Sequence, residues 1–179
     1  MNIDVEYTPN PNARKFVLGK TVIANGSKQF NAAGEAQGDQ LAEKLFDLKG
    51  VASVFYLGDF ITVEKADDDI NWRIFEEDVK KVISENFSEE KAGSTPEGKL
   101  SDTDENLKKI NEILDETVRP GLAMDGGGLE VLELTPDLKL SVKYHGACGS
   151  CPSSTYATLQ AITFILKDNF HPEIEVVAV

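Results

Sequence analysis

Residues 138–154 read LKLSVKYHGACGSCPSS, and this stretch decides the fold of the C-terminal half. Apolar and polar side chains alternate through its first seven residues, which predicts a strand with one buried face. Glycines then surround two cysteines, Cys148 and Cys151, in a short loop. Pro152 suits the first turn of a helix, because the N–H that proline lacks has no partner there. The stretch therefore predicts a strand, a loop with a Cys-x-x-Cys motif, and a helix.

The surrounding patterns extend this unit to a domain over residues 107–179. Apolar residues at helical spacing, or in strict alternation, mark each further element. The predicted elements are a helix over 107–118 that stops before Pro120, strands over 129–134 and 138–144, a helix over 152–168 and a strand over 174–179. The order α-β-β-α-β is typical of a two-layer α+β domain.

Residues 1–87 carry their own strand and helix patterns, and we expect a second small two-layer α/β sandwich there. Gly58-Asp59 is a favourable two-residue hairpin turn between two apolar runs. The predicted elements are strands over 3–7, 15–18, 21–24, 51–57 and 60–64, and helices over 39–48 and 71–87.

Residues 88–106, SEEKAGSTPEGKLSDTDEN, contain six acids, and their only apolar side chains are Ala92 and Leu100. Such a segment buries too little apolar area to order and repels itself. It predicts a flexible acidic linker, with domains 1–87 and 107–179 that tumble independently. A long surface loop within one domain is the alternative, although loops of this length are uncommon in compact domains.

The composition excludes several classes of protein. The chain has 18 Lys and Arg against 31 Asp and Glu, a net charge of −13, which disfavours both nucleic acid and anionic membranes as partners. No apolar run is long enough to span a membrane, and no secretory signal is recognisable. Two cysteines three residues apart cannot define a disulfide framework. We expect a cytoplasmic protein, with the mitochondrial matrix or a plastid still open if a transit peptide has been removed.

The Cys-x-x-Cys loop is the predicted site of chemistry. A helix N-terminus favours a thiolate at Cys151, and the glycines let backbone N–H groups approach sulfur. We expect the loop to present both thiolates outward. Two thiolates fill half of the cysteine set that iron–sulfur clusters usually take, and an identical chain across a two-fold axis can supply the rest. A cluster shared in this way would be labile, which suits a carrier.

Three alternatives stay open at this point. A strand, Cys-x-x-Cys and helix also occur in thioredoxin-like dithiol oxidoreductases, although the βαβ unit expected before that motif is missing. A zinc-binding module would use Cys148 and Cys151 with His145 and His171, the last a whole helix away. Finally, the two cysteines could be buried and inert, which the Gly and Ser neighbours disfavour.

Two sets of motifs resemble one known family, the Nfu-type, NifU-like iron–sulfur cluster scaffold proteins. The C-terminal set, which resembles the NifU-like domain, is Arg119-Pro120, Asp125-Gly126-Gly127, Gly146-Ala147-Cys148, Cys151-Pro152-Ser153-Ser154, Thr158-Leu159, Ile162 and Pro172-Glu173. The N-terminal set, which resembles the Nfu N-terminal domain, is Glu6, Thr8-Pro9-Asn10-Pro11-Asn12, Lys15-Phe16, Leu41-Ala42, Leu45-Phe46, Gly50-Val51 and Asp59-Phe60-Ile61-Thr62-Val63.

The resemblance implies a function without turnover chemistry. It implies a scaffold or carrier that holds a labile 4Fe–4S cluster, or a 2Fe–2S form, between the subunits of a homodimer. Cys148 and Cys151 match the family's ligands. The implied partners are an upstream cluster donor and recipient iron–sulfur apoproteins.

Two further segments have competing interpretations. Gly128 stands where the family often has an acid or amide, and residues 125–128 are interpreted as a flexible turn, with a second functional loop as the alternative. Residues 8–12, TPNPN, are interpreted as a stiff turn between strands. Alternatively, this turn forms a surface for recipient apoproteins, since proline reduces the entropy lost on binding.

Overall fold

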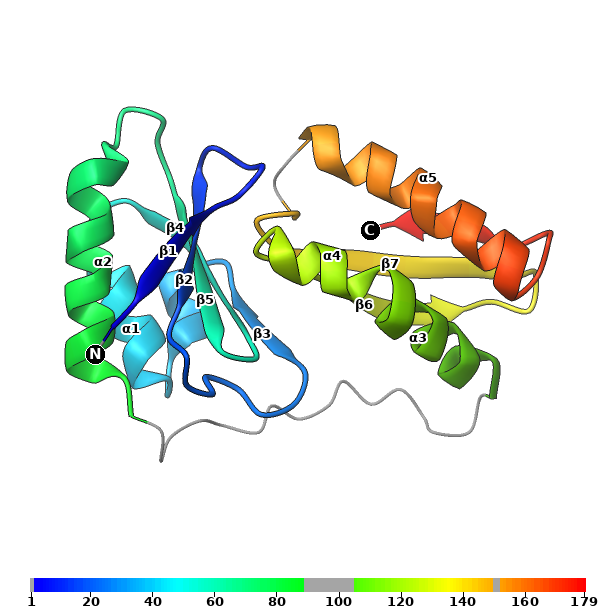
Figure 1. Cartoon of the computed structure of the whole chain (residues 1–179), viewed down its shortest axis with the longest axis horizontal. Helices are drawn as coiled ribbons and strands as arrows, with labels where there is room; N and C mark the ends of the chain where they lie inside the picture. The colour runs from blue at the N-terminus through cyan, green and yellow to red at the C-terminus, as the bar shows by residue number, and fades with distance from the viewer. Residues whose placement is uncertain (1, 89–104, 150–151) are drawn as a thin grey trace.

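The computed structural model describes residues 2–88, 105–149 and 152–179, with residues 152–155 described by their backbone only. It contains two α+β domains, which confirms the predicted fold class (Figure 1). The predicted flexible linker lies largely outside the described residues, as does Cys151. None of the helices within these ranges is long and apolar enough to cross a membrane.

The N-terminal domain is a five-stranded antiparallel sheet with two helices on one face (Figure 1). Its strands pair in the order β1-β2-β5-β4-β3. The elements are β1 (Asp4–Tyr7), β2 (Ala13–Val17), β3 (Ser27–Phe30), a 3-10 turn η1 (Ala33–Ala36), α1 (Gln40–Phe46), β4 (Val51–Leu57), β5 (Phe60–Lys65) and α2 (Trp72–Asn86). Alternate strand residues such as Val54, Tyr56, Ile61 and Val63 face the helices and form the core.

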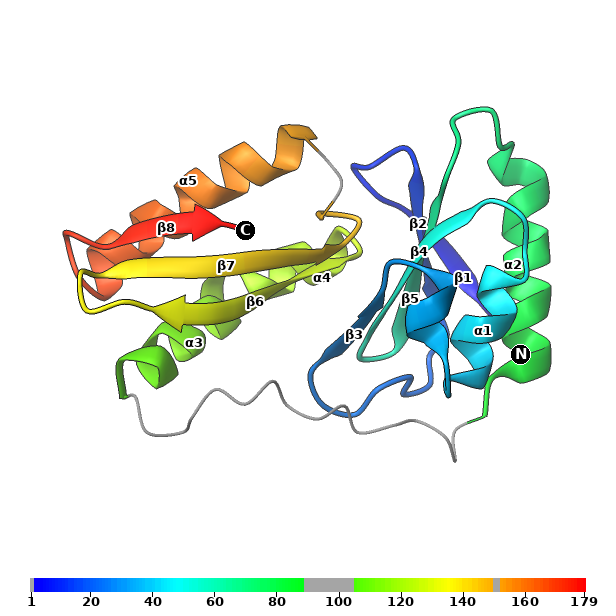
Figure 2. The same ribbon diagram turned by 180° about the vertical axis from the view of Figure 1, so that it is seen from behind.

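The C-terminal domain has a three-stranded sheet in the order β6-β7-β8, with its helices over one face (Figure 2). β7 pairs antiparallel with β6 and parallel with β8, because α5 crosses between β7 and β8. The elements are α3 (Glu105–Thr117), α4 (Arg119–Met124), β6 (Gly127–Leu134), β7 (Lys139–Gly146), α5 (Pro152–Asn169) and β8 (Glu175–Ala178). This confirms the order α-β-β-α-β, with α4 added after the first helix.

One local prediction was wrong. Residues 21–24 form no strand, because the N–H groups of Val22 and Ile23 both donate to the carbonyl oxygen of Gly58, which holds them in a turn. The strand in this region is β3, further along the chain. The predicted end of the first C-terminal helix before Pro120 is confirmed, because α3 ends at Thr117 and Pro120 occupies the first turn of a separate helix, α4, where it displaces no hydrogen bond.

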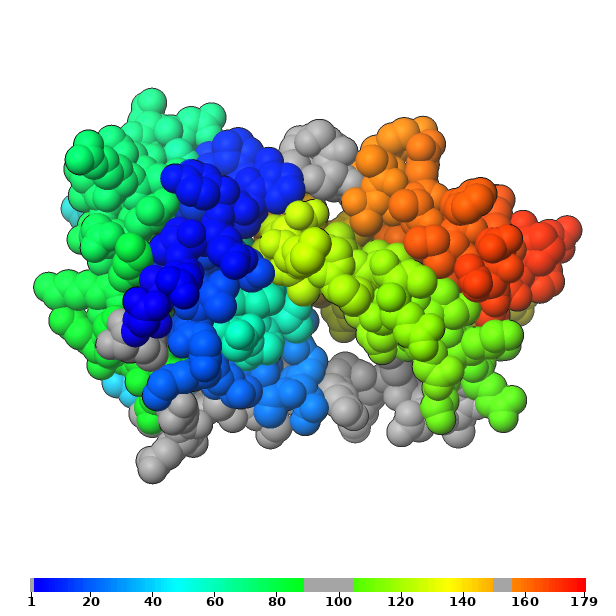
Figure 3. Space-filling view, in the orientation of Figure 1, coloured from blue at the N-terminus to red at the C-terminus, as the bar shows by residue number. Residues whose placement is uncertain are grey.

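The two domains are in contact, which the sequence analysis did not predict. α1 and α2 lie on the far side of their sheet, and its other face is turned toward the C-terminal domain (Figures 1 and 2). The first strands lie against the chain around α4 in the space-filling view (Figure 3). Side chains from β3 and β5 hydrogen-bond to backbone groups beside Cys148. Independent tumbling of the two domains stays a prediction, and these contacts oppose it.

Candidate functional site

The ladder between β6 and β7 positions the cysteine loop. Gly127 at the start of β6 pairs with Gly146 at the end of β7, and the chain then turns through Cys148 toward α5. Gly146 has a φ of 61°, a left-handed conformation that glycine adopts without strain. The N–H of Ala147 donates to the carbonyl oxygen of Gly126 (3.2 Å), which fastens the loop to the turn before β6. The predicted arrangement of strand, loop and helix is confirmed.

Cys148 is buried, with 4% of its surface exposed, and belongs to the core of the C-terminal domain. The expectation that the loop presents this thiol outward was wrong for the structure described. Without a metal, a thiol behaves as a small apolar group, and burial in a core is its ordinary environment. The side chain must therefore rotate or the loop must shift before the sulfur can bind a ligand shared with a second chain. Cys151 lies outside the described residues.

Gly127 leaves room for the Cys148 sulfur. A Cβ atom at position 127 would lie 2.6 Å from Sγ of Cys148 and 2.8 Å from the carbonyl oxygen of His145. No side chain fits at that distance, so a glycine is required by close approach. The structure thus brings the glycine run at 126–128 against the cysteine loop, where the sequence had favoured a simple turn.

Tyr144 supplies an unused hydrogen-bond donor beside the loop. It is buried, and within the described residues its hydroxyl has no hydrogen-bond partner. Burial and the neighbouring Cys148 raise the pKa of Tyr144 to about 12, so the hydroxyl keeps its proton at neutral pH. A buried donor without an acceptor is unfavourable in the cluster-free protein. The sequence placed Tyr144 on the buried face of β7 but did not indicate its relation to Cys148.

The two histidines of the zinc alternative are engaged elsewhere. His145 Nε2 lies 3.0 Å from Oε2 of Glu130, and its ring stacks on Phe55. His171 Nδ1 accepts a hydrogen bond from the N–H of Glu173 (3.2 Å). Over residues 2–88, 105–149 and 152–179, no three His, Cys, Asp or Glu side chains gather as a metal site. The geometry gives the zinc alternative no support.

Residues of the N-terminal domain complete the surroundings of the loop. The side chain of Asn10, in the TPNPN segment, donates to the carbonyl oxygen of Ala147 (3.2 Å). The segment is a turn, as expected, since the N–H of Ala13 donates to the carbonyl oxygen of Asn10. Neither interpretation of the TPNPN segment, a stiff turn or a surface for recipient proteins, predicted its contact with Ala147.

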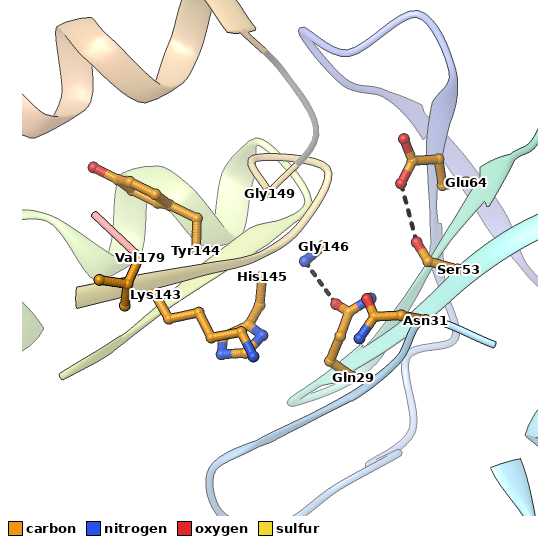
Figure 4. Close-up of a pocket in the computed structure, with 10 residues that line it drawn as sticks. All are labelled: Gln29, Asn31, Ser53, Glu64, Lys143, Tyr144, His145, Gly146, Gly149 and Val179. Atoms are coloured by element: carbon orange, nitrogen blue, oxygen red, sulfur yellow. Dashed lines mark hydrogen bonds between the residues drawn. The ribbon is translucent and has the colours of Figure 1, made fainter. Parts of the chain in front are cut away.

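A cavity of about 270 Å³ lies at the junction of the two domains, beside the cysteine loop (Figure 4). Its lining comes from both domains: Gln29, Asn31, Ser53 and Glu64 on one side, and Lys143, Tyr144, His145, Gly146, Gly149 and Val179 on the other. The cavity is small, and its lining mixes charged and polar groups with few apolar ones. It resembles a gap at a domain junction more than a pocket for a small-molecule substrate.

Comparison with known proteins assigns both halves. Residues 3–90 match the family described as "Scaffold protein Nfu/NifU N terminal", and residues 110–177 match "NifU-like domain". The chain belongs to the Nfu-type, NifU-like family of scaffold proteins. The recognition from the two motif sets is thereby confirmed.

Individual relatives of this Nfu-type chain agree. It is 34% identical to the human protein named "NFU1 iron-sulfur cluster scaffold homolog, mitochondrial", over 98% of this chain and 70% of the relative. It is 31% identical to "NifU-like protein 4, mitochondrial" of Arabidopsis thaliana, over 93% of this chain and 62% of that relative. The chain thus spans less than two thirds of the plant protein. A crystal structure of protein SAV1430 from Staphylococcus aureus, 28% identical, matches 46% of this chain and 99% of its own with a TM-score of 0.40.

Proposed function

We propose that this chain is an iron–sulfur cluster carrier, in which Cys148 and Cys151 of each of two subunits hold one 4Fe–4S cluster. The cluster is cargo, received from an upstream donor and passed to recipient apoproteins. The observation that carries the proposal is the position of Cys148, in the loop between β7 and α5. The names of the relatives support a scaffold for iron–sulfur clusters.

Two features of the loop fit a sulfur-rich cargo. The buried hydroxyl of Tyr144 is a hydrogen-bond donor without an acceptor among the described residues, and a sulfur atom of a bound cluster can accept a hydrogen bond from it. Gly127 leaves the sulfur of Cys148 without a side chain on one side. A thiolate-rich cluster needs such donors and close backbone approach.

An enzymatic role is less well supported. The strands before the motif form an antiparallel hairpin, β6 and β7, in place of the βαβ unit of thioredoxin-like proteins. We therefore propose that the chain performs no catalysis of its own.

The domain division and the compartment follow as proposals. Residues 1–87 and 107–179 form the two domains, joined by the acidic segment 88–106. The relatives are named as mitochondrial proteins, and a cytoplasmic location for this chain remains a prediction. The net charge of −13 supports protein partners in preference to nucleic acid or an anionic membrane.

Anaerobic reconstitution with ferrous iron and sulfide tests the proposal. We expect a dimer by light scattering, with iron and sulfide at two per chain, because four irons are shared by two chains. One iron per chain in a dimer would indicate a 2Fe–2S cluster instead. Cys148→Ala and Cys151→Ala are the controls and should bind no cluster. An intact 4Fe–4S cluster on a single chain would contradict sharing between subunits.

A further inference from the structure

The N-terminal sheet has a second buried face. Along β4, Val54 and Tyr56 belong to the domain's own core, so Phe55 between them points to the opposite face. Phe55 is nevertheless 0% exposed, although it is not a member of that core. On β5, Thr62 faces the same way and is 2% exposed. A sheet face that one would expect in solvent is therefore covered, and the C-terminal domain covers it.

Phe55 fits into a gap that glycines leave beside the cysteine loop. Its ring lies parallel to that of His145, with centroids 6.1 Å apart. A Cβ atom at Gly128 would lie 3.0 Å from Cζ of Phe55, and one at Gly146 would lie 2.7 Å from its Cδ1. No side chain fits at Gly146, and a side chain at Gly128 would require the ring of Phe55 to move.

Three hydrogen bonds surround this aromatic contact, and each reaches backbone of the cysteine loop or of the turn packed against it. Thr62 Oγ1 donates to the carbonyl oxygen of Gly126 (2.7 Å). The N–H of Gly146 donates to Oε1 of Gln29 (2.9 Å), as Figure 4 shows. The bond from Asn10 to the carbonyl oxygen of Ala147 is the third. The docked domain thus holds the two residues that immediately precede Cys148.

We propose that the N-terminal domain is an intramolecular cap on the Cys148 loop, docked in the cluster-free chain and released when a cluster joins two subunits. The proposal rests on the proposed function, because sharing a cluster requires two such loops to face one another. The cap and a second subunit compete for the same loop, since the cap bonds to Gly146 and Ala147. The cap also favours the conformation in which Cys148 is buried.

Gly128 offers a clean way to remove the cap. The three atoms nearest to a Cβ at this position all belong to Phe55, and the residue has no left-handed φ that would strain a side chain. Gly128→Gln should therefore disturb docking and leave the C-terminal domain folded. Gly121 also has no left-handed φ, and a Cβ atom added there would have no atom within 4 Å. Gly121→Gln is therefore the matched control. Phe55→Ala, outside the core of its own domain, is a second route to the same result.

The test follows the full chain by 15N relaxation and by small-angle scattering, before and after anaerobic loading. Cluster-free wild type and Gly121→Gln should tumble as one body. The chemical shift of the Gly146 amide in both should differ from its value in Gly128→Gln, because only the docked chain makes its bond to Gln29. Gly128→Gln and Phe55→Ala should tumble as two bodies. The loaded wild-type dimer should also show independent N-terminal domains. Because a docked cap reduces the competent fraction, Gly128→Gln should tighten the loaded dimer by about tenfold or more.

Each other outcome is decisive. If the cluster-free wild type tumbles as two bodies, the cap does not exist. If the loaded dimer keeps its N-terminal domains docked, docking is a permanent interface and the cap is refuted, although the carrier function stands. If no cluster binds to any variant, the proposed function fails and the release step with it, while the cluster-free comparison still decides whether the domains dock.

Discussion

The ring of His145 lies parallel to the ring of Phe55, with the two planes 1° apart. Offset parallel rings at this separation attract each other beyond the area that they bury, by about 0.5–1.5 kcal/mol. His145 also lies three residues before Cys148, and its Nε2 is paired with Glu130. The histidine that the zinc alternative assigned as a ligand is therefore part of the contact between the two domains.

This arrangement predicts the result of His145→Gln. The substitution removes the stack on Phe55 but should leave the iron content of the reconstituted protein unchanged, because the proposed ligands are Cys148 and Cys151. Zinc affinity of the variant, measured by competition with a chelator, should also equal that of the wild type. A tenfold or larger loss of zinc affinity would return the zinc-binding module to consideration.

Substitutions of Cys148 should affect stability as well as cluster binding. Cys148→Ala should bind no cluster and destabilise the C-terminal domain by about 1 kcal/mol, since the missing atom leaves a small cavity. Thermal unfolding of the cluster-free variant measures this cost. An unfolding temperature equal to that of the wild type would show that the Cys148 side chain is not packed in the core.

Gly127→Ala tests the close packing of the sulfur. Its methyl group would meet Sγ of Cys148 and the carbonyl oxygen of His145, so the backbone must shift, at a cost of about 1–3 kcal/mol. Gly121→Ala is the control, with no atom within 4 Å of the added methyl. In α4 it should stabilise the domain slightly, because alanine favours helix. Equal unfolding temperatures for the two variants would contradict the packing described.

Tyr144→Phe should have opposite effects on the two forms of the protein. In the cluster-free form it removes a buried hydroxyl without a partner among the described residues, which should stabilise the domain by about 1 kcal/mol. In the loaded form it removes a donor beside Cys148, so the cluster should be lost faster. Tyr156→Phe, on the exposed face of α5, is the control. Cluster lifetime is followed by visible absorption, and an unchanged lifetime would show that the hydroxyl does not reach the cluster.

The elements with strong periodicity were predictable from the sequence. β7 alternates cleanly, and α3 keeps apolar residues at helical spacing, so both were placed within two residues. β3 was missed because SKQF holds one apolar side chain, which suits an edge strand whose Gln29 faces the backbone of Gly146. The apolar residues Val22 and Ile23 suggested a strand. They are buried, but their N–H groups donate to the carbonyl oxygen of Gly58 and pair with no neighbouring strand among the described residues.

The contact between domains had only one indication in the sequence. Val54, Phe55 and Tyr56 are consecutive apolar residues, a pattern typical of a strand buried on both faces. The remaining contacts use single polar side chains on backbone groups, and gaps that glycines leave. Neither has a periodicity that a sequence reveals. For the same reason the burial of Cys148 could not be inferred, since Gly-rich surroundings suggest exposure until the packing of Gly127 is known.

The last prediction concerns the direction of cluster transfer. When the cluster leaves, Cys148 can return to the core and the cap can dock again on Gly146 and Ala147. Both changes stabilise the cluster-free chain. Dissociation of the dimer also restores translational and rotational freedom, which is worth several kcal/mol of free energy. A recipient whose four cysteines are already in one chain has no such entropy to lose. Transfer should therefore run forward, faster than assembly from free iron and sulfide.

The cap's share of this driving force can be separated with Gly128→Gln. In that variant the loaded form keeps its ligands, but the released chain cannot gain the docked contact, so transfer should be less complete than with Gly121→Gln. We expect the equilibrium for transfer to a four-cysteine apoprotein to shift by about tenfold, by the same linkage that governs the dimer. Transfer that runs backward in the wild type would indicate a storage protein instead of a carrier. Equal completeness in the two glycine variants would show that release of the cluster owes nothing to the cap.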